Sequence, residues 1–480
     1  MSVGPSPSIH LGDGALSAIT VAFVVGVWSC GTWPSAVVVA VASSIAVTSW
    51  LLRRGRAGGL VLVAGAILVV GGVLGERAWS RTEPERLGAF RGWAVVVDDP
   101  SPIGRGQRVT VEIEDERFAL RGYGRVAGKV ARLAAGERVW IEGRRTALVG
   151  SAARRAAVRH IVGDVDVDLV GDVLDGAPAA RAANRVRRLL RAAAEATMSD
   201  DIAALFTGLV VGDDARQSPQ VVDDFRASGL SHLTAVSGQN LTYLLAALAP
   251  LLGRLRPVVR WTVTIGAILW FMSLTRFEPS ILRAGVMAIL ASTAFVRGRD
   301  LGAVRALAGA VMFLVAIDPL LVWSVGFWLS VSATAGVVVA GPRLALIVPG
   351  PQWLRIPLGV TLGAQVGVAI PSLVVFGRLP LVALVANPAA VPVAGAVMVA
   401  GVPCAVLAVI VSEVLPDPVA GVGASLVMVP VEVATRWVAE VARVAATVEP
   451  AEPWPLLGWL VVVLAIGTRV ARTRVQGSPA

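Results

Sequence analysis

Charged residues are scarce in this chain. Asp, Glu, Lys and Arg together make up 16% of its 480 residues, and 55% of the residues are hydrophobic. A typical soluble domain has roughly a quarter of its residues charged, and the mean hydropathy here is +0.73. A soluble protein of this size could not bury so much apolar surface, so lipid must surround part of the chain.

Histidine and cysteine are also rare, with three and two copies. His10, His160 and His232 are far apart in the sequence and cannot supply a His-rich metallohydrolase site, and the two cysteines make no metal motif. There is no phosphate-binding GxxxxGK[ST] loop, which excludes an ATP-driven motor of that kind. His232 and Ser237 are poorly spaced for a base–nucleophile pair on one helix face. We therefore expect no enzyme activity, no metal and no cofactor.

Apolar runs, by contrast, are long and close to the ~20 residues that cross a bilayer. They lie at 15–33, 35–52, 59–75, 232–252, 258–275, 281–296, 301–316, 320–340, 357–376, 381–411 and 456–471. No Lys or Arg precedes the first run, as it would in a cleavable signal peptide, so we expect a retained helix there. The run 381–411 contains Pro388, Pro392 and Pro403. It could cross twice, but we favour a re-entrant hairpin.

Arginine-rich short loops indicate the orientation, because such loops stay in the cytoplasm. Arg53, Arg254, Arg297 and Arg472 mark predicted cytoplasmic segments. Both termini are then cytoplasmic, and the segment after the third helix lies outside the cell. The predicted organisation is N-terminal helices (1–75), an extracytoplasmic domain (76–172), amphipathic surface helices (173–230), a multi-pass membrane domain (231–472) and a cytoplasmic tail (473–480).

The segment 76–172 is soluble in character. Short alternating runs such as WAVVVDD and RVWIEGRR are typical of strands in a small antiparallel barrel. Their number and length suit an OB-like barrel, although the pattern does not separate it from an SH3-like one. The predicted fold class is thus a polytopic α-helical membrane protein with an inserted small all-β, OB-like domain. Trp93, Phe118, Tyr123 and Trp140 could stack on bases there, or fill the barrel core.

The segment 178–198 is amphipathic and rich in arginine. Arg181, Arg185, Arg188 and Arg191 can share one face of a helix. Such a helix could lie on the membrane surface or contact a polyanion, and Arg185 and Arg188 are candidates for DNA contacts.

Polar residues inside the membrane domain are the candidate functional site. The predicted lining of a polar path is His232, Thr234, Ser237, Gly238, Gln239, Asn240, Arg276, Glu278, Arg283, Asp318, Gln365 and Asn387. Residues 232–240 begin an otherwise apolar helix, where polar groups are costly in lipid and so should face a cavity. Arg276 and Glu278 belong to an external turn, and Arg283 lies one turn into the next helix. Helix capping and interhelical hydrogen bonds are the alternative explanation.

Several motifs resemble the ComEC family of bacterial competence proteins. In chain order they are FRASGLSHLTAVSG at 225–238, PSILRAGVM at 279–287, Asp318–Pro319 followed by GFWLS at 326–330, and Gln365 to Pro371 with Asn387–Pro388 and Pro392 behind it. Any one motif would be weak, but their order and spacing make the match specific. The resemblance covers about residues 200 to 400, and the N-terminal layout agrees with it.

The resemblance implies a membrane channel that passes one strand of transforming DNA into the cytoplasm. It also implies an external OB-like domain. The implied partners are single-stranded DNA, the lipid bilayer, an external DNA receptor, a cytoplasmic helicase and a separate nuclease. A strand with a charge at every phosphate needs an aqueous path with hydrogen-bonding walls and positive charge, which the polar clusters could supply.

Two departures from the family pattern stand out. Gln239–Asn240 replaces a Leu–His pair that commonly follows Ser237–Gly238, so any role of that histidine is not expected here. Many members also carry a C-terminal metallo-β-lactamase-like domain, which we do not expect here because the sequence has only three histidines, so we expect a nuclease to be a separate protein. The alternatives are a transporter or flippase for a smaller polar solute, and an envelope scaffold.

Overall fold

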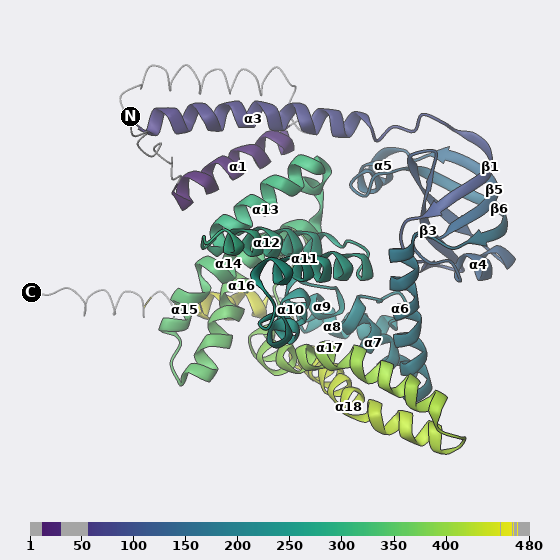
Figure 1. Ribbon diagram of the computed structural model, residues 1–480. Coiled ribbons are helices and arrows are strands. Elements are labelled where there is room, and N and C mark those ends of the chain that lie inside the picture. The colour runs from purple at the N-terminus through teal and green to yellow at the C-terminus, as the bar shows by residue number, and fades with distance from the viewer. Residues whose placement is uncertain (1–11, 30–55, 452, 463, 465–467, 469–480) are drawn as a thin grey trace, which may run out of the picture.

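A computed structural model describes residues 12–29, 56–451, 453–462, 464 and 468. The predicted helix 35–52, Arg53, Arg472 and the tail 473–480 lie outside the described residues, as do parts of the runs 15–33 and 456–471. The described chain is mostly helical, and a β-domain stands to one side of the helices (Figure 1).

Two described helices come first, α1 (Asp13–Ser29) and α3 (Arg56–Ser80). They pack backbone to backbone: a Cβ atom on Gly26 would lie 2.2 Å from the carbonyl oxygen of Leu68. Small residues permit such close approach, which matters in lipid because no hydrophobic effect drives helices together there. Part of α3, Val63–Ser80, is long and apolar enough to cross a membrane.

The β-domain is a six-stranded sheet that closes on itself. Its strands are β1 (Gly88–Val96), β2 (Ser101–Ile103), β3 (Gly106–Ile113), β4 (Glu116–Gly122), β5 (Arg138–Ala147) and β6 (Ile161–Leu174). The order is β1-β5-β6-β4-β3-β2, and β1 also pairs with β3, which closes the ring. Strands β4 and β6 are parallel, and the other pairs are antiparallel. This is the arrangement of an OB-like barrel, so the predicted fold class is confirmed.

Alternating apolar residues fill the barrel. Val111, Ile113, Phe118, Leu120 and Ile141 have no exposed surface. Successive side chains of a strand point to opposite faces, so each strand contributes every second residue to this core. Two short helices lie between strands, α4 (Arg125–Val130) after β4 and α5 (Gly150–Ala157) after β5.

Three helices connect the barrel with the membrane domain: α6 (Pro178–Thr197), α7 (Asp200–Val211) and α8 (Pro219–Ala227). Helix α6 packs against α7, α11 and α17 and keeps several arginines exposed on its other side. Helix α7 is buried from Ala203 to Val211. The structure therefore differs from the expectation of surface helices throughout 173–230, because α7 is enclosed by its neighbours.

The remaining helices form the membrane domain. They are α9 (Ser231–Thr234), α10 (Gly238–Leu252), α11 (Pro257–Leu274), α12 (Pro279–Val296), α13 (Ala303–Ile317), the 3-10 helix η1 (Pro319–Trp323), α14 (Val325–Val339), α15 (Gly341–Ile347), α16 (Gln352–Phe376), α17 (Ala383–Val414) and α18 (Val419–Val448). Among the described residues six helices are long and apolar enough to cross a membrane, or seven if α14 and α15, bent by 49°, form one span. The chain is thus a multi-pass membrane protein.

Helices α14 and α16 pack along a seam of glycines. A Cβ atom on Gly336 would lie 2.1 Å from the carbonyl oxygen of Gly363, and one on Gly367 would lie 2.1 Å from that of Ser332. The two backbones are therefore in direct contact, as in small-residue helix packing in membranes.

The re-entrant hairpin expected at 381–411 is wrong. Residues 383–414 form one continuous helix, α17, with Pro388, Pro392 and Pro403 inside it. Prolines are tolerated in membrane helices because neighbouring groups satisfy the freed carbonyls. Ala386, Ala390 and other small residues bury one side of α17 against its neighbours.

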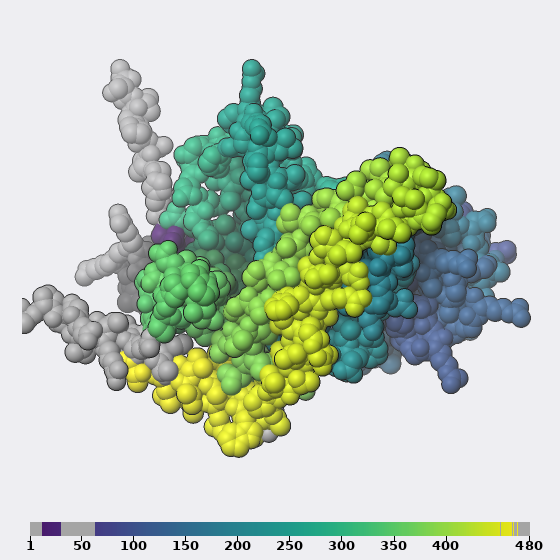
Figure 2. All heavy atoms as spheres, turned by 90° about the horizontal axis from the view of Figure 1, so that it is seen from below, coloured from purple at the N-terminus to yellow at the C-terminus, as the bar shows by residue number. Residues whose placement is uncertain are grey.

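Helix α18 was not predicted as a span. Its charged residues hide its apolar character in the sequence, but they pair along the helix, Arg436 with Glu432 at 2.7 Å and Arg443 with Glu440. Oppositely charged pairs at this spacing stabilise a helix. Helices α17 and α18 pack against each other and run side by side across the face seen in Figure 2, with the barrel at one end.

Candidate functional site

A break in the helix precedes α10. After the short helix α9, Ala235 and Ser237 are extended, and α10 begins at Gly238 with Ser237 as its N-terminal cap residue. The Oγ of Ser237 donates a hydrogen bond to Oδ1 of Asn240 at 3.2 Å. The expected continuous helix 232–252 is therefore wrong, because Ser–Gly starts a new helix at 237–238.

Arg283 lies directly against Gly238. A Cβ atom on Gly238 would be 2.7 Å from an Nη2 atom of Arg283, so the missing side chain makes room for the guanidinium. The Nε of Arg283 donates to the Oγ of Ser330 at 2.8 Å, and Nη1 lies 3.0 Å from the sulfur of Met287. Arg283 is only 6% exposed. In the described part of the chain no carboxylate pairs with it, so the site carries an uncompensated positive charge.

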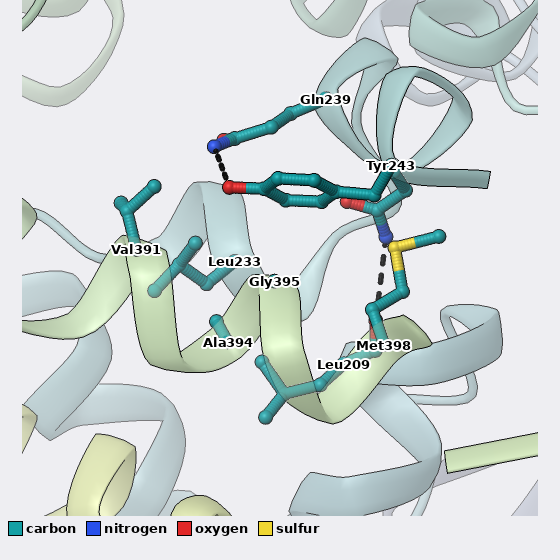
Figure 3. A pocket seen from close by; sticks show the side chains of 9 residues that line it. Leu209, Leu233, Gln239, Tyr243, Val391, Ala394, Gly395 and Met398 are labelled. Carbon is teal, nitrogen blue, oxygen red and sulfur yellow. Dashed lines mark hydrogen bonds between the residues drawn. The ribbon is translucent and has the colours of Figure 1, made fainter. Parts of the chain in front are cut away.

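A small pocket lies between α10 and α17. Figure 3 shows Gln239 reaching over it to Tyr243, with Nε2 donating to the phenolic oxygen at 2.7 Å. The Tyr243 ring lies over Gly395, where a Cβ atom would be 2.5 Å from the ring. Nδ2 of Asn240 donates to the carbonyl of Leu209 at 3.3 Å. The pocket has room for about one water molecule, so a DNA strand does not fit in it.

The predicted residues of this segment thus fall into two groups. Gln239 and Asn240 line the pocket, and Ser237 is linked to it through Asn240. His232 is exposed, and Thr234 donates its hydroxyl to the carbonyl of Ser231 at 3.1 Å.

Other predicted path residues lie elsewhere. Gln365 is buried within α16, and the Oδ1 atom of Asn387 in α17 is buried without a hydrogen-bond partner among the described residues. Glu278 is the residue before α12. Arg276 and Asp318 contact the barrel instead of the pocket. The sequence placed all of them in one path, but the structure brings only part of the set together.

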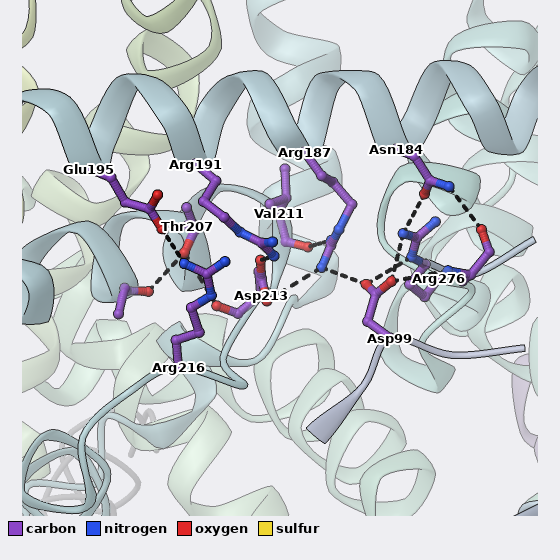
Figure 4. Close-up of polar contacts among 12 residues, drawn as sticks. Asp99, Asn184, Arg187, Arg191, Glu195, Thr207, Val211, Asp213, Arg216 and Arg276 are labelled. Atoms are coloured by element: carbon purple, nitrogen blue, oxygen red, sulfur yellow. Dashed lines mark hydrogen bonds and ion pairs between the residues drawn. The ribbon is translucent and has the colours of Figure 1, made fainter. Parts of the chain in front are cut away.

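The junction between barrel and helices is a second polar site. Asp99, in the loop between β1 and β2, accepts two hydrogen bonds from Arg276, at 3.0 Å from Nε and 2.8 Å from Nη2. Arg187 of α6 lies 2.9 Å from the same carboxylate. Burial alone would raise the pKa of Asp99, but the charges of Arg187 and Arg276 hold it below its usual value. Figure 4 shows these groups meeting beneath α6.

Asp213 extends this network away from the barrel. It lies 2.6 Å from Arg191 and 3.7 Å from Arg187, and its side chain is almost completely buried. Nη1 of Arg187 also donates to the carbonyls of Val211 and Leu274, at 2.8 and 3.2 Å. Arg187 therefore ties α6 to the ends of α7 and α11.

Sequence reasoning missed Asp99, Arg187, Asp213 and Tyr243. Asp99 and Arg187 are far apart in the chain, and nothing in their spacing indicates that they meet. Asp213 offered one signal, because it directly follows the left-handed Gly212 that ends α7. A carboxylate at the end of a buried helix needs a partner.

The predicted DNA-binding aromatics of the barrel differ in exposure. Phe118 is fully buried in the barrel core and cannot stack on a base, which corrects that assignment. Trp93 and Trp140 are half-buried cross-strand partners with ring centroids 5.5 Å apart. Tyr123 is 53% exposed. Arg185 and Arg188 of α6 are exposed as well.

These observations define a multi-pass membrane protein with an OB-like barrel docked on helices that carry a buried arginine and a polar helix break. Residues 209–473 match the family described as Competence protein. The chain belongs to this family, of the ComEC and ComA type.

A relative from Neisseria gonorrhoeae, named "Competence protein ComA", is 29% identical over 228 residues. The match covers 44% of this chain and 31% of the relative, so this chain spans about a third of the relative's length. No solved structure matches the chain.

Proposed function

We propose that this protein takes part in DNA uptake during competence and passes a single DNA strand across the cytoplasmic membrane. Membership of the Competence protein family supports the role. The main structural support for a DNA strand as the substrate is Arg283. This buried cation lies beside Gly238 and the polar segment 237–240, and no carboxylate pairs with it among the described residues.

Arg283 has a physical reason to meet an anion. A buried charge without a partner is costly, and inside a membrane it is expected to face a cavity or a substrate path. Ser330 and Met287 occupy two of its donors and carry no negative charge. A phosphate of a passing strand would compensate the charge, and neutral groups such as Gln239 and Asn240 would replace lost hydration without holding the strand tightly.

The proposed strand path is closed at the pocket between α10 and α17. The pocket at Gln239 and Asn240 is about the size of a water molecule. Passage of a strand therefore requires α10 and α17 to separate, which would move Tyr243 off Gly395. The second candidate is a transporter or flippase for a smaller polar solute, because a smaller solute would need less separation of α10 and α17 than a DNA strand.

The proposed orientation places the barrel outside the cell and both termini inside. The turn at Arg276, which was predicted to be external, contacts the barrel, and Asp318 at the end of α13 also contacts it. Helix α18 adds one crossing after α17, so that the C-terminal arginines return to the cytoplasm without a re-entrant segment. Both observations support the arrangement expected from the arginine-bearing loops.

We propose that the protein acts without a catalytic step of its own. Single-stranded DNA and lipid are its proposed direct partners. A DNA receptor outside the cell, a helicase in the cytoplasm and a separate nuclease complete the proposed pathway.

The test is DNA uptake in a transformable strain whose own homologue has been deleted. The wild-type gene and Arg283→Ala are compared, with Arg299→Ala as a matched control because Arg299 is exposed. We expect Arg283→Ala to lower the amount of nuclease-resistant internal DNA while surface-bound DNA is unchanged. Normal uptake by Arg283→Ala at normal abundance would contradict the strand path. Failure of the wild-type gene to restore uptake would favour a small-solute transporter.

A further inference from the structure

The carboxylate of Asp99 is surrounded by hydrogen-bond donors of Arg187, Arg276 and Ala135, and we call this set of donors the seat of Asp99. Its Oδ1 atom receives Nη2 of Arg276 at 2.8 Å and the backbone nitrogen of Ala135 at 3.3 Å. Its Oδ2 atom receives Nε of Arg276 at 3.0 Å and lies 2.9 Å from Nη2 of Arg187. Two guanidinium groups in this fork geometry suit either a carboxylate or a phosphate.

Without Asp99, the groups that the helices contribute to this seat would carry a positive charge. Asp213 forms an ion pair with Arg191 at 2.6 Å and lies farther from Arg187, at 3.7 Å. The other side-chain partner of Arg276 is the neutral Asn184, whose Oδ1 accepts from Nη2 at 2.7 Å. Removing Asp99 would thus leave Arg276 without an anionic partner and Arg187 with a weaker one, so another anion would be attracted to the vacated seat.

The carboxylate belongs to a different domain from the arginines. Asp99 is carried by the loop between β1 and β2, which Asp98 fixes by accepting from the backbone nitrogen and the hydroxyl of Thr110, both at 2.6 Å. The loop is therefore a firm part of the barrel, and Asp99 would leave the seat if the barrel moved. Two further contacts tie the barrel down, Asn184 to the carbonyl of Ala135 at 3.1 Å and His160 to Asp318 at 2.9 Å.

The turn that carries Arg276 is strained. Arg276 and Phe277 have φ values of 59° and 54°, a region that residues other than glycine rarely adopt. Backbone strain of this kind persists only where the surrounding structure enforces it. The position of the Arg276 guanidinium is thus determined by more than its ion pair.

We propose that Arg187, Arg276 and Asn184 form a binding site for a nucleic-acid phosphate, which Asp99 of the barrel occupies as a displaceable carboxylate. The site is connected to the polar pocket, because Arg187 donates to the carbonyl of Val211 and Asn240 donates to that of Leu209, both in the last turn of α7. The phosphate as ligand rests on the proposed function. A phosphate that replaces Asp99 would release the barrel loop and hold the strand beside the pocket.

The experiment measures oligonucleotide binding by the full chain in lipid nanodiscs. A fluorescein-labelled oligothymidylate is titrated against the wild type, Asp99→Asn and the control Asp175→Asn. Asp175 is a matched control because its side chain is 77% exposed and lies 4.0 Å from its nearest arginine, Arg181. We expect Asp99→Asn to bind about tenfold more tightly, equivalent to ~1.4 kcal/mol, and Asp175→Asn to bind as the wild type does. Adding Arg276→Gln to Asp99→Asn should remove the gain.

Several outcomes would overturn the site. One is a folded Asp99→Asn variant with unchanged or weaker binding, since a purely structural ion pair predicts no gain. Should that variant fail to fold, hydrogen exchange on the wild type decides. The oligonucleotide should then increase exchange of the amides in loop 97–100, and unchanged exchange would contradict displacement.

Pyrophosphate serves as a second probe, which separates the anion site from the proposed DNA substrate. Tighter pyrophosphate binding by Asp99→Asn, without oligonucleotide binding by any variant, would support the anion site and reject DNA as the substrate.

Discussion

Asn240 in α10 donates a hydrogen bond from Nδ2 to the carbonyl oxygen of Leu209 in α7, 3.3 Å away. This bond joins the polar helix break to a helix buried among its neighbours. Because Arg187 reaches the carbonyl of Val211 in the same turn of α7, the barrel junction and the pocket share one structural element. Changes at one of these sites should therefore be felt at the other.

Asn240→Leu should reduce DNA internalisation without lowering the abundance of the protein. The substitution leaves the Leu209 carbonyl without its donor, at a cost of about 1–3 kcal/mol, and removes a polar group from the pocket. Uptake of labelled DNA and immunoblotting measure the two quantities. Thr242→Val is the control, because Thr242 is exposed and its hydroxyl donates to a carbonyl of its own helix. Equal uptake by both variants would remove Asn240 from the path.

Gly238→Ala should impair uptake because a Cβ atom there would lie 2.7 Å from Arg283 and 2.9 Å from Ala284. The guanidinium would have to shift away from the helix break. Gly266→Ala in α11 is the matched control, since a Cβ atom there meets nothing within 4 Å. The same uptake assay compares the two, and normal uptake by Gly238→Ala would show that the approach of Arg283 is not needed.

The barrel should fold by itself as an all-β domain, because its core is formed by its own strands. Circular dichroism of an excised segment containing residues 84–176 tests this, and a spectrum dominated by helix would contradict it. Within that segment Phe118→Ala should lower the free energy of unfolding by about 3–5 kcal/mol, whereas the exposed Tyr123→Ala should change it little. We expect binding of single-stranded DNA by the isolated barrel to be weak and salt-dependent, because its charge excess is small.

The proposed orientation can be tested with single cysteines and a reagent that does not cross the membrane. We expect labelling in intact cells at position 123 of the barrel and no labelling at position 254, in the loop between α10 and α11. Labelling of both positions after permeabilisation is the control for accessibility. The opposite result, labelling at 254 and not at 123 in intact cells, would invert the orientation.

The sequence predicted the overall architecture because strong physical signals carry it. Apolar runs indicate helices in lipid, and the alternation around Val111 and Ile141 predicts strands. It failed where a local rule was outweighed by packing. The prolines of α17 suggested a broken segment, but a membrane helix tolerates proline where neighbouring groups satisfy the freed carbonyls, and α17 is continuous. The charged residues of α18 concealed a further span.

The candidate site was predictable only in part. Gln239, Asn240 and Arg283 were found because polar residues in apolar surroundings are conspicuous. The meeting of Asp99 with Arg187 and Arg276 depends on how the barrel docks, and no periodicity or spacing encodes that contact. Arg276 and Asp318 were placed in the same path as Arg283 because all three are polar residues in an apolar domain, but both contact the barrel instead.

The glycine seam between α14 and α16 has a mechanical consequence. Where Gly336 and Gly367 bring the backbones of α14 and α16 into contact, no side chain lies between the two helices that could rotate to separate them. The two helices are therefore expected to move together as one rigid unit. The boundary between α10 and α17 is different, because there the ring of Tyr243 separates the helix from Gly395 and can swing on its own χ1 bond. If the helix bundle widens, the separation would therefore begin between α10 and α17, at Tyr243, rather than between α14 and α16.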